Sequence, residues 1–312
     1  MSVTTIGSIN TAAVNHEKRH RIQVYLAWAV VLSVIAVVAI YGFDYYGLSA
    51  ADRPFSPKYH LLRPGGRIGI NLGIFGVSMF GVLFLYPLRK RLKWLASIGT
   101  TRHWLDFHIV VGTTAPIIIA LHSSFKFRGI AGMAFWIMVA VAVSGIIGRY
   151  IYAQIPRRLN STEISLKELD AMERELTEQL AAQKVVSQRD LQPLFRLPRV
   201  ENVRKKWALT AIVTMLMLDL ARPFKIARVR AKSLSFGGTL LALGGLLPTS
   251  NRELEHIIQL AKRKSSLSKR AIFLARTQQL FHLWHVIHRP FSYSFAVLAV
   301  LHIAVVLLLG FM

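Results

Sequence analysis

Residues 107–125 read FHIVVGTTAPIIIALHSSF, an uncharged run with one histidine near each end, His108 and His122. Residues 290–312 form a second uncharged run, PFSYSFAVLAVLHIAVVLLLGFM, which contains His302, and His288 lies two residues before it. In both cases the two histidines are fourteen residues apart. Because a helix of about 20 apolar residues can cross a membrane, both runs predict membrane-spanning helices that carry paired histidines.

Three other runs of uncharged, mainly apolar residues have the length of a span, at residues 22–43, 68–88 and 129–148. Together with residues 107–125 and 290–312, they predict an all-α integral membrane bundle of five transmembrane helices. The first run is too long for a cleaved signal peptide, and the bulky Tyr45 and Tyr46 follow it where a cleavage site needs small residues. We therefore expect a multi-pass protein that retains its first helix.

The composition agrees with lipid as a solvent of this chain. Of the 312 residues, 53% are hydrophobic and 17% are charged, whereas soluble domains carry about 25% charged residues. The chain has no cysteine, which excludes disulfides, cysteine-ligated iron–sulfur clusters, thiolate zinc sites and covalently attached c-type haem. The net charge of +24 indicates contact with anionic lipid headgroups or an acidic partner, and we expect no nucleic-acid partner.

The basic residues that flank the spans predict the orientation of the protein. On the side of the N-terminus they are Lys18, Arg19, Arg21, Arg89, Lys90, Arg91, Lys93, Arg102, Arg149, Arg157 and Arg158. On the opposite side they are Arg53, Lys58, Arg63, Arg67, Lys126 and Arg128. This excess predicts a cytoplasmic N-terminus in a bacterial-type inner membrane, and it makes the first, third and fifth spans parallel.

The predicted organisation has three parts. Residues 1–154 contain four spans, residues 155–281 form a long helical insertion on the cytoplasmic side, and residues 282–312 form the fifth span. Within the insertion, residues 165–184 have helical periodicity, and residues 252–276 form a basic amphipathic helix that we expect to lie on an anionic membrane face. Residues 207–220 are apolar but short, and we predict an interfacial or re-entrant helix that ends near Asp219, Arg222 and Pro223.

The paired histidines are the most informative residues, because ionisable side chains inside a membrane are costly and usually functional. Fourteen residues at 100° each give about 1400°, roughly 40° short of four turns, so both histidines of a helix lie on nearly one helix face, about 21 Å apart. In a hydrocarbon layer of about 30 Å, one histidine of each helix lies toward each surface. Parallel spans pair His108 with His288 and His122 with His302. If residues 207–220 span the membrane, the last helix inverts and His108 pairs with His302.

Such pairs suit two stacked haem b groups, in which each iron takes one histidine from each helix. Trp104 and Trp284 lie four residues before His108 and His288, which agrees with pairing at equal depth. Zinc or copper fits less well, because two histidines without a carboxylate or thiolate are an incomplete tetrahedral set. His285 points away from the face of His302, and we assign it as a reserve ligand or a propionate contact.

Small and basic residues complete the candidate cofactor site. Gly112 follows His108 by one helical turn, and a small side chain there admits either a macrocycle or a neighbouring helix. The candidate propionate partners are Lys126 and Arg128 near the outer pair, and Arg102, Arg149 and Arg289 near the inner pair. Each of these cations is also consistent with an ordinary side chain that reaches the membrane surface.

Three segments resemble the dihaem b-type membrane cytochromes, which include ferric-reductase-like and NADPH-oxidase-like membrane domains and the cytochrome b/b6 and b561 types. The segments are RHWLDFHIVVGTTAPIIIALHSSFKFRG, AVSGIIGRYIYAQIPR and LWHVIHRPFSYSFAVLAVLHI, and they belong to the third, fourth and fifth predicted spans. The resemblance implies electron transfer across a membrane, with His108, His122, His288 and His302 at the axial-ligand positions. Oxidase-like relatives carry a flavin- and nucleotide-binding domain after their spans, and this sequence does not, so we expect electrons from a quinol or from an iron–sulfur, flavin or c-type cytochrome subunit.

Two functions follow from this sequence. The first is a dihaem electron-transfer subunit of an oxidoreductase complex, with a quinone as an additional cofactor. The second is a non-redox membrane transporter or scaffold in which the buried histidines relay protons. The two functions differ in a simple observable, because only the first protein absorbs visible light.

Overall fold

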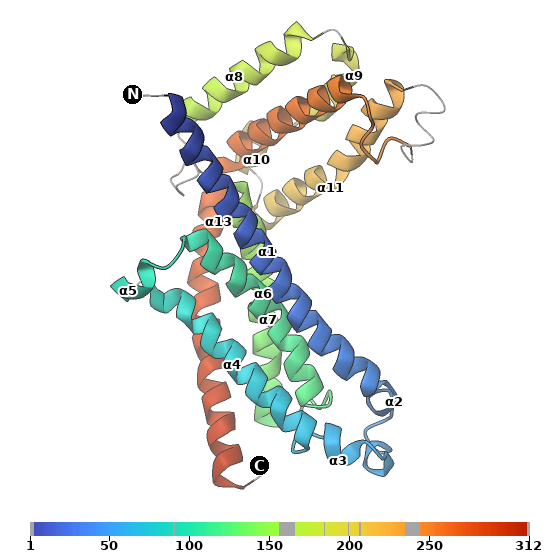
Figure 1. Cartoon of the computed structure of the whole chain (residues 1–312), viewed down its shortest axis with the longest axis vertical. Helices are drawn as coiled ribbons and strands as arrows, with labels where there is room; N and C mark the ends of the chain where they lie inside the picture. The colour runs from blue at the N-terminus through green and yellow to red at the C-terminus, as the bar shows by residue number, and fades with distance from the viewer. Residues whose placement is uncertain are drawn as a thin grey trace. The chain divides into compact units, whose positions relative to one another are not determined.

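The computed structural model describes residues 3–89, 91–155, 166–183, 185–198, 200–205, 207–234 and 244–310. Within these ranges, the side chains of residues 3–14, 16, 102, 166, 167, 200, 204, 205 and 208 are not described. All regular elements in the described ranges are helices, and none is a strand (Figure 1). The predicted all-α class is therefore confirmed for this part of the protein.

Five segments are long and apolar enough to cross a membrane, and each overlaps one of the predicted runs: Glu17–Tyr41, Tyr59–Arg89, His103–His122, Gly129–Gln154 and Arg252–Leu308. They belong to α1 (Val3–Tyr41), α3 (Tyr59–Leu62) with α4 (Arg67–Arg89), α6 (Thr101–His122), α7 (Gly129–Gln154) and α13 (Arg252–Leu308). Apolar side chains along them remain uncovered, for example Ile40 at 77% exposure and Val300 at 65%. Such surface is stable in contact with lipid. By the length and apolar composition of these segments, the protein is a helical membrane protein.

The chain divides into two compact units. Unit 1 consists of Met1–Ile147 and His285–Met312, and unit 2 consists of Gly148–Trp284. Helix α13 is continuous from Arg252 to Leu308, so its first part belongs to unit 2 and its last part to unit 1. The predicted start of a fifth span at residue 282 is therefore an internal position of one long helix.

Unit 1 is built on the packing of α6 against α4 and α1. Ala115, Ile118 and Leu121 of α6 are buried against Leu72 and Met79 of α4, and Val31 of α1 joins this cluster. The glycines of α4 allow a close approach, because a Cβ atom on Gly76 would lie 2.4 Å from Ile119 Cδ1. The three helices therefore form a tight layer that fixes the position of α6.

Two buried arginines hold the connections at the two ends of α4. After α2 (Phe43–Tyr46), the 3-10 helix η1 (Arg53–Phe55) provides Arg53, which donates to the carbonyls of Tyr46, Leu48 and Ser124. At the other end, beyond which lies α5 (Lys93–Ala96), Arg89 donates to the carbonyls of Ala96 and Gly99 at 2.9 and 2.7 Å. Both side chains, which the sequence analysis used only for orientation, therefore have structural partners.

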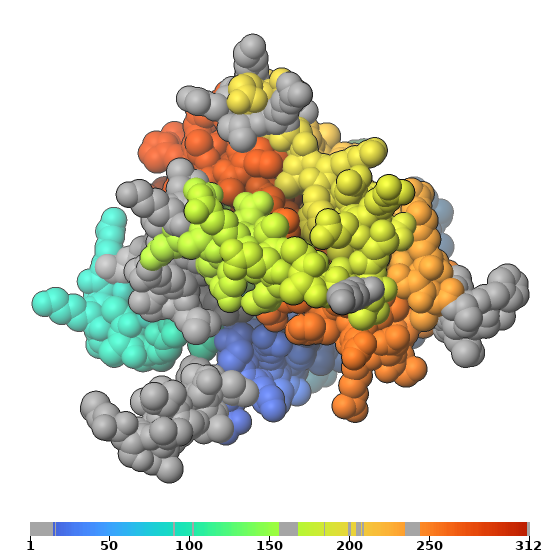
Figure 2. Space-filling view, turned by 90° about the horizontal axis from the view of Figure 1, so that it is seen from above, coloured from blue at the N-terminus to red at the C-terminus, as the bar shows by residue number. Residues whose placement is uncertain are grey.

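Unit 2 contains α8 (Leu166–Ala182), α9 (Gln188–Phe195), α10 (Val200–Lys205), α11 (Ala208–Lys232) and the first part of α13. Its core includes Leu180 of α8, Leu191 of α9, and Leu254 and Ile257 of α13. Side chains of α8 and α9 meet on one face, in yellow-green and yellow (Figure 2). The apolar face of residues 252–276, which we predicted to lie on a membrane, is thus buried between helices. Neighbouring helices can cover the apolar face of an amphipathic helix just as a lipid surface can.

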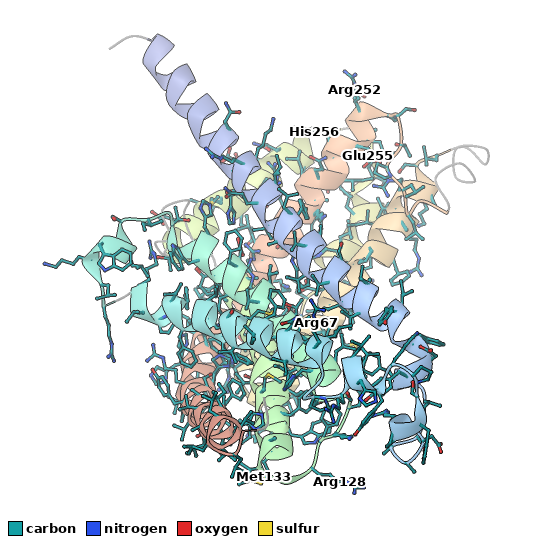
Figure 3. The ribbon with its side chains drawn as sticks, turned by 60° about the horizontal axis from the view of Figure 1, so that its bottom comes forward. Arg67, Arg128, Met133, Arg252, Glu255 and His256 are labelled. Carbon is teal, nitrogen blue, oxygen red and sulfur yellow. The ribbon has the colours of Figure 1, made fainter. Side chains whose placement is uncertain are left out.

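The start of α13 is fixed by an ion pair with the end of α11. Glu255 accepts from Arg230 Nε at 2.7 Å and Arg230 Nη2 at 2.9 Å, and it also accepts from the Thr249 backbone N–H at 3.0 Å. Figure 3 shows Glu255 beside Arg252 and His256 in the first turns of α13. Burial opposes ionisation of this carboxylate, but the hydrogen bonds from Arg230 and Thr249 outweigh burial and lower the pKa of Glu255.

Helix α11 extends to Lys232, and the prediction that it ends near Asp219 and Pro223 is wrong. Asp219 accepts from Lys269 Nζ through both oxygens, at 2.6 Å each, and from the Tyr150 hydroxyl at 2.8 Å. Lys269 is 1% exposed. A charge with such partners can remain inside a helix, so its presence does not end the helix. Burial opposes ionisation of Asp219, but the hydrogen bonds from Lys269 and Tyr150 outweigh burial and lower its pKa.

We expect Asp219→Asn to destabilise unit 2 by about 3–5 kcal/mol, because the variant leaves the Lys269 ammonium buried without an anion. The matched control is Asp190→Asn, since the Asp190–Lys232 pair at 2.9 Å is largely exposed and its removal costs less than about 1 kcal/mol. The measurement is the free energy of unfolding in detergent at neutral pH.

The contribution of a carboxylate with a lowered pKa is complete above its unfolded-state pKa and is lost as pH falls through its folded-state pKa. The difference in unfolding free energy between wild type and Asp219→Asn must therefore become smaller in acid. Equal stability of both variants at neutral pH contradicts the assignment.

Candidate functional site

The four predicted ligand histidines all lie in unit 1. His108 and His122 lie near the two ends of α6, and His288 and His302 lie in the last part of α13. Each side chain is partly buried. His288 interacts electrostatically with His108, and His302 interacts with His122. The neighbours in the structure are therefore those of the parallel arrangement.

The His122 ring is held by the backbone of α4. Its Nδ1 lies 2.7 Å from the Gly69 carbonyl oxygen. A carbonyl can only accept, so Nδ1 carries the hydrogen and Nε2 carries the lone pair. The ring also lies directly on Gly73, where an added Cβ would be 2.8 Å from His122 Cε1. This arrangement fixes both the orientation and the tautomer of the imidazole, as metal-ligating histidines require.

The His288 ring is held in a similar way by α7. Its Nδ1 lies 2.7 Å from Ser144 Oγ, and Ser144 donates to the Val141 carbonyl at 2.8 Å. Because the hydroxyl hydrogen is used in that bond, Nδ1 must donate to Ser144 and Nε2 again carries the lone pair. Gly145 keeps this face open, since a Cβ there would lie 3.8 Å from His288 Cε1.

His108 has a different environment. Its Nδ1 is buried and makes no well-aligned hydrogen bond to a described residue, although the ring interacts with the Leu83 backbone. The Tyr86 ring lies 5.2 Å away, tilted by 44°. A buried nitrogen without a partner costs about 1–3 kcal/mol, which marks the surroundings of His108 as incomplete for an isolated imidazole.

Phe295 separates the two histidine pairs along α13. It lies seven residues from both His288 and His302, is 8% exposed, and packs with Ala120, Phe135 and Met138. The Phe80 ring lies 4.7 Å from the Phe295 ring. The two pairs are therefore separate sites with an aromatic contact between them.

The other candidate cofactor residues are less closely connected to the histidines. A Cβ on Gly112 would meet Leu83 Cδ2 at 3.6 Å, so this glycine faces α4. Lys126, Arg128 and Arg289 are exposed, and Arg128 points outward in Figure 3. Arg149 belongs to unit 2, with its guanidinium 6.0 Å from the Tyr152 ring, and the Arg102 side chain lies outside the described residues. His285 interacts electrostatically with its neighbour His288.

A second polar cluster lies near the start of α6, and sequence reasoning missed it. His20 of α1 is 5% exposed, lies 3.1 Å from Asp106 Oδ2, and stacks on His103 with ring centroids 3.6 Å apart. Among the described residues, no group of three or more His, Asp or Glu side chains has an arrangement that could hold a metal ion. This cluster therefore ties α1 to α6 and does not itself form a metal centre.

Gly69, Gly73 and Ser144 are the positioning residues that sequence analysis did not connect to the histidines. The available signal was the recurrence of Gly69, Gly73 and Gly76 at helical spacing within the second apolar run. Which histidine these glycines contact depends on the packing of α4 on α6, which no sequence spacing specifies.

Comparison with known proteins adds no relative. No protein-family model, no curated protein and no solved structure matches this chain.

We expect Gly73→Ala to destabilise unit 1 by about 1–3 kcal/mol, because the new methyl group overlaps the His122 ring and forces α4 and α6 apart. Gly81→Ala is the matched control on the same helix, since a Cβ there meets nothing within 4 Å and alanine favours the helix by up to about 1 kcal/mol. The measurement is the unfolding free energy of each variant in detergent. A decrease in stability in both variants, or in neither, contradicts the packing of the His122 ring on Gly73.

Proposed function

We propose that this protein is a dihaem b-type membrane cytochrome that carries electrons between the two faces of a membrane. His108 and His288 would hold the iron of one haem, and His122 and His302 would hold the iron of the other. The observation that carries the proposal is the agreement between equal sequence spacing on two helices and the two pairs of neighbouring histidines.

The state of the imidazoles supports this assignment. The Nδ1 atoms of His122 and His288 donate to Gly69 and Ser144, which leaves the Nε2 lone pair as the group that can bind iron. A haem iron would be held by one imidazole nitrogen from each histidine of a pair.

The helix packing also supports it. Helix α6 packs closely on α4 and α1, and α4 holds the His122 ring through Gly69 and Gly73. Ala120 of α6 packs in one cluster with Phe295 of α13, which lies between the two histidine pairs. These contacts would keep the histidine rings in fixed positions for two haems.

When bound, haem supplies reversible one-electron transfer at iron. The chain's own residues orient the ligands, keep water from the pairs and separate the two sites with Phe295. We further propose a five-span topology in a bacterial-type inner membrane, with the N-terminus in the cytoplasm. Electrons enter or leave through a quinone or through iron–sulfur, flavin or c-type cytochrome subunits of a larger oxidoreductase complex.

The purified protein should show the absorption bands of a reduced b-type cytochrome and contain about two haems per chain. His122→Ala and His302→Ala should each remove the same haem and leave about one, and His108→Ala and His288→Ala should each remove the other. The measurement is haem content together with the difference spectrum of each variant. Equal loss of both haems from a single change in any of the four is evidence against two independent sites.

Ser144→Ala should retain both haems but shift the reduction potential of one of them to a more positive value. Without the acceptor for its Nδ1–H, His288 donates less electron density to the iron, which favours the reduced state. Ser78→Ala is the control, because Ser78 is exposed and donates to the Ile74 carbonyl of its own helix. Redox titration is the measurement, and unchanged potentials in Ser144→Ala argue against His288 as a ligand.

A colourless preparation that does not bind added haem overturns the proposal. It favours the transporter or scaffold, in which the same histidines transfer protons.

A further inference from the structure

Helix α11 has an apolar face on each side. Ala211 and Met215 are 0% and 2% exposed and pack with Val203 and Phe273 in the core of unit 2. The opposite face carries exposed apolar side chains that we call the α11 stripe: Leu209, Val213, Leu216, Met217, Leu220 and Phe224, with exposed fractions from 39% to 68%. At 100° per residue these positions fall within an arc of about 100°. A continuous exposed apolar surface of this kind marks a binding surface.

The polar contacts of α11 connect the stripe to the end of a candidate span. Asp219 accepts from the Tyr150 hydroxyl at 2.8 Å and from Gln154 Nε2 at 3.4 Å, and both donors lie in the last turns of α7. A span that starts at Gly129 leaves the hydrocarbon after about 20 residues, so Tyr150 lies at the level of the headgroups. Within unit 2, the Trp284 ring also packs directly on Gly148. Aromatic residues at this level are typical of the membrane–water interface.

The charges around the stripe identify its partner. Lys225 and Arg228 lie in the C-terminal third of α11, and Arg228 is exposed at the edge of the arc. Lys232, in the last turn, is paired with Asp190 at 2.9 Å. The single acidic residue of α11 is Asp219, which is engaged with Lys269 on the inner side. An apolar stripe flanked by cations is the pattern of a helix that lies in an anionic membrane surface.

We propose that the α11 stripe is inserted into the boundary between headgroups and acyl chains of the bilayer, and that Lys225 and Arg228 bind anionic phospholipid headgroups. The inference rests on the membrane embedding of the proposed function and is independent of haem. It assigns the lipid surface to α11 rather than to residues 252–276. Insertion of α11 anchors unit 2 at the surface that a redox partner or quinone must approach.

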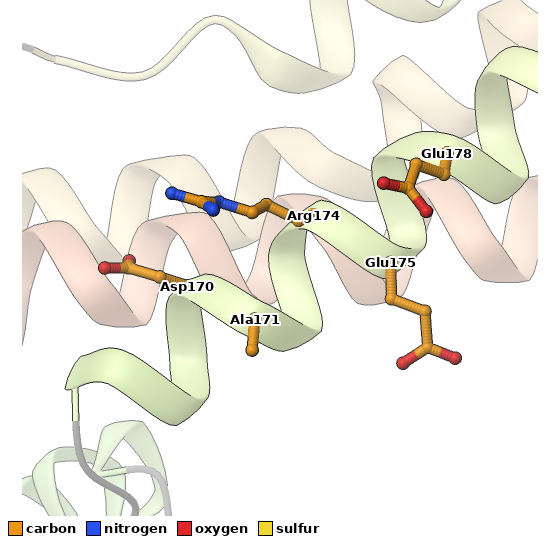
Figure 4. A pocket seen from close by; sticks show the side chains of 5 residues that line it. All are labelled: Asp170, Ala171, Arg174, Glu175 and Glu178. Atoms are coloured by element: carbon orange, nitrogen blue, oxygen red, sulfur yellow. The ribbon is translucent and has the colours of Figure 1, made fainter.

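The chain contains no cysteine, so single-cysteine variants of the full chain can be spin-labelled without background. The variants are Leu209→Cys, Val213→Cys and Leu220→Cys on the stripe, each in nanodiscs of phosphatidylcholine with phosphatidylglycerol. Val300→Cys reports on a candidate span, and Glu175→Cys reports on water, because its carboxylate extends away from α8 (Figure 4). Collision rates of each label with oxygen, which concentrates in lipid, and with a water-soluble nickel chelate are the measurement.

We expect labels on the stripe to resemble Val300→Cys, with high oxygen and low nickel collision rates. If they resemble Glu175→Cys while Val300→Cys reports lipid, the α11 inference fails and the membrane embedding stands. If Val300→Cys also reports water, the proposed membrane function fails. Labels shielded from both reagents show that protein, such as a second copy of the chain, covers the stripe, which also overturns the inference.

The headgroup contact is tested separately with Leu220→Cys. Replacing phosphatidylglycerol with phosphatidylcholine, or combining Lys225→Gln with Arg228→Gln, should shift the insertion equilibrium toward water by about fivefold for each ion pair between a cation and a headgroup that is removed. Lys262→Gln with Arg263→Gln, two exposed cations of α13, is the control and should leave the collision rates unchanged. If the Leu220→Cys label inserts equally in both lipids, the proposed binding of anionic headgroups is wrong.

Discussion

An imidazole in a membrane-spanning helix is stable only when both of its ring nitrogens have partners. In this protein four histidines of two apolar helical segments face that constraint. Gly69 accepts from His122 and Ser144 accepts from His288, each at 2.7 Å. These bonds orient the two imidazoles, and such orientation of the rings is the chemical basis of the proposed function.

The same constraint explains the uneven helix packing of unit 1. On one side of α6, the glycines of α4 allow the His122 ring to lie against the backbone. On the side of α13, the contact is made by a few larger side chains, chiefly Phe295 with Ala120, Phe135 and Met138. The close packing on α4 fixes the orientation of the His122 ring, whereas Phe295 lies between the two histidine pairs.

Unit 2 differs from unit 1 in that it holds charged residues between its helices. The Lys269 ammonium is neutralised by Asp219 inside the unit, and Arg230 is neutralised by Glu255 at its edge. Because these pairs stabilise the inner side of α11, the apolar residues on its outer side need not contribute to the core. They are therefore available for lipid, which is the physical basis of the proposed anchor.

The sequence by itself determined the all-α class, the five apolar segments and the equal spacing of the two histidine pairs, because hydrophobic runs and helical periodicity are local properties of the chain. It also identified residues 207–220 as unsuited to a simple span, although it placed the end of that helix too early. Only the tertiary structure decided which face of residues 252–276 is covered, that Asp219 pairs with Lys269, and that Gly69, Gly73 and Ser144 hold the histidines. These contacts join residues that lie far apart in the chain, so they depend on how helices pack and not on any local pattern.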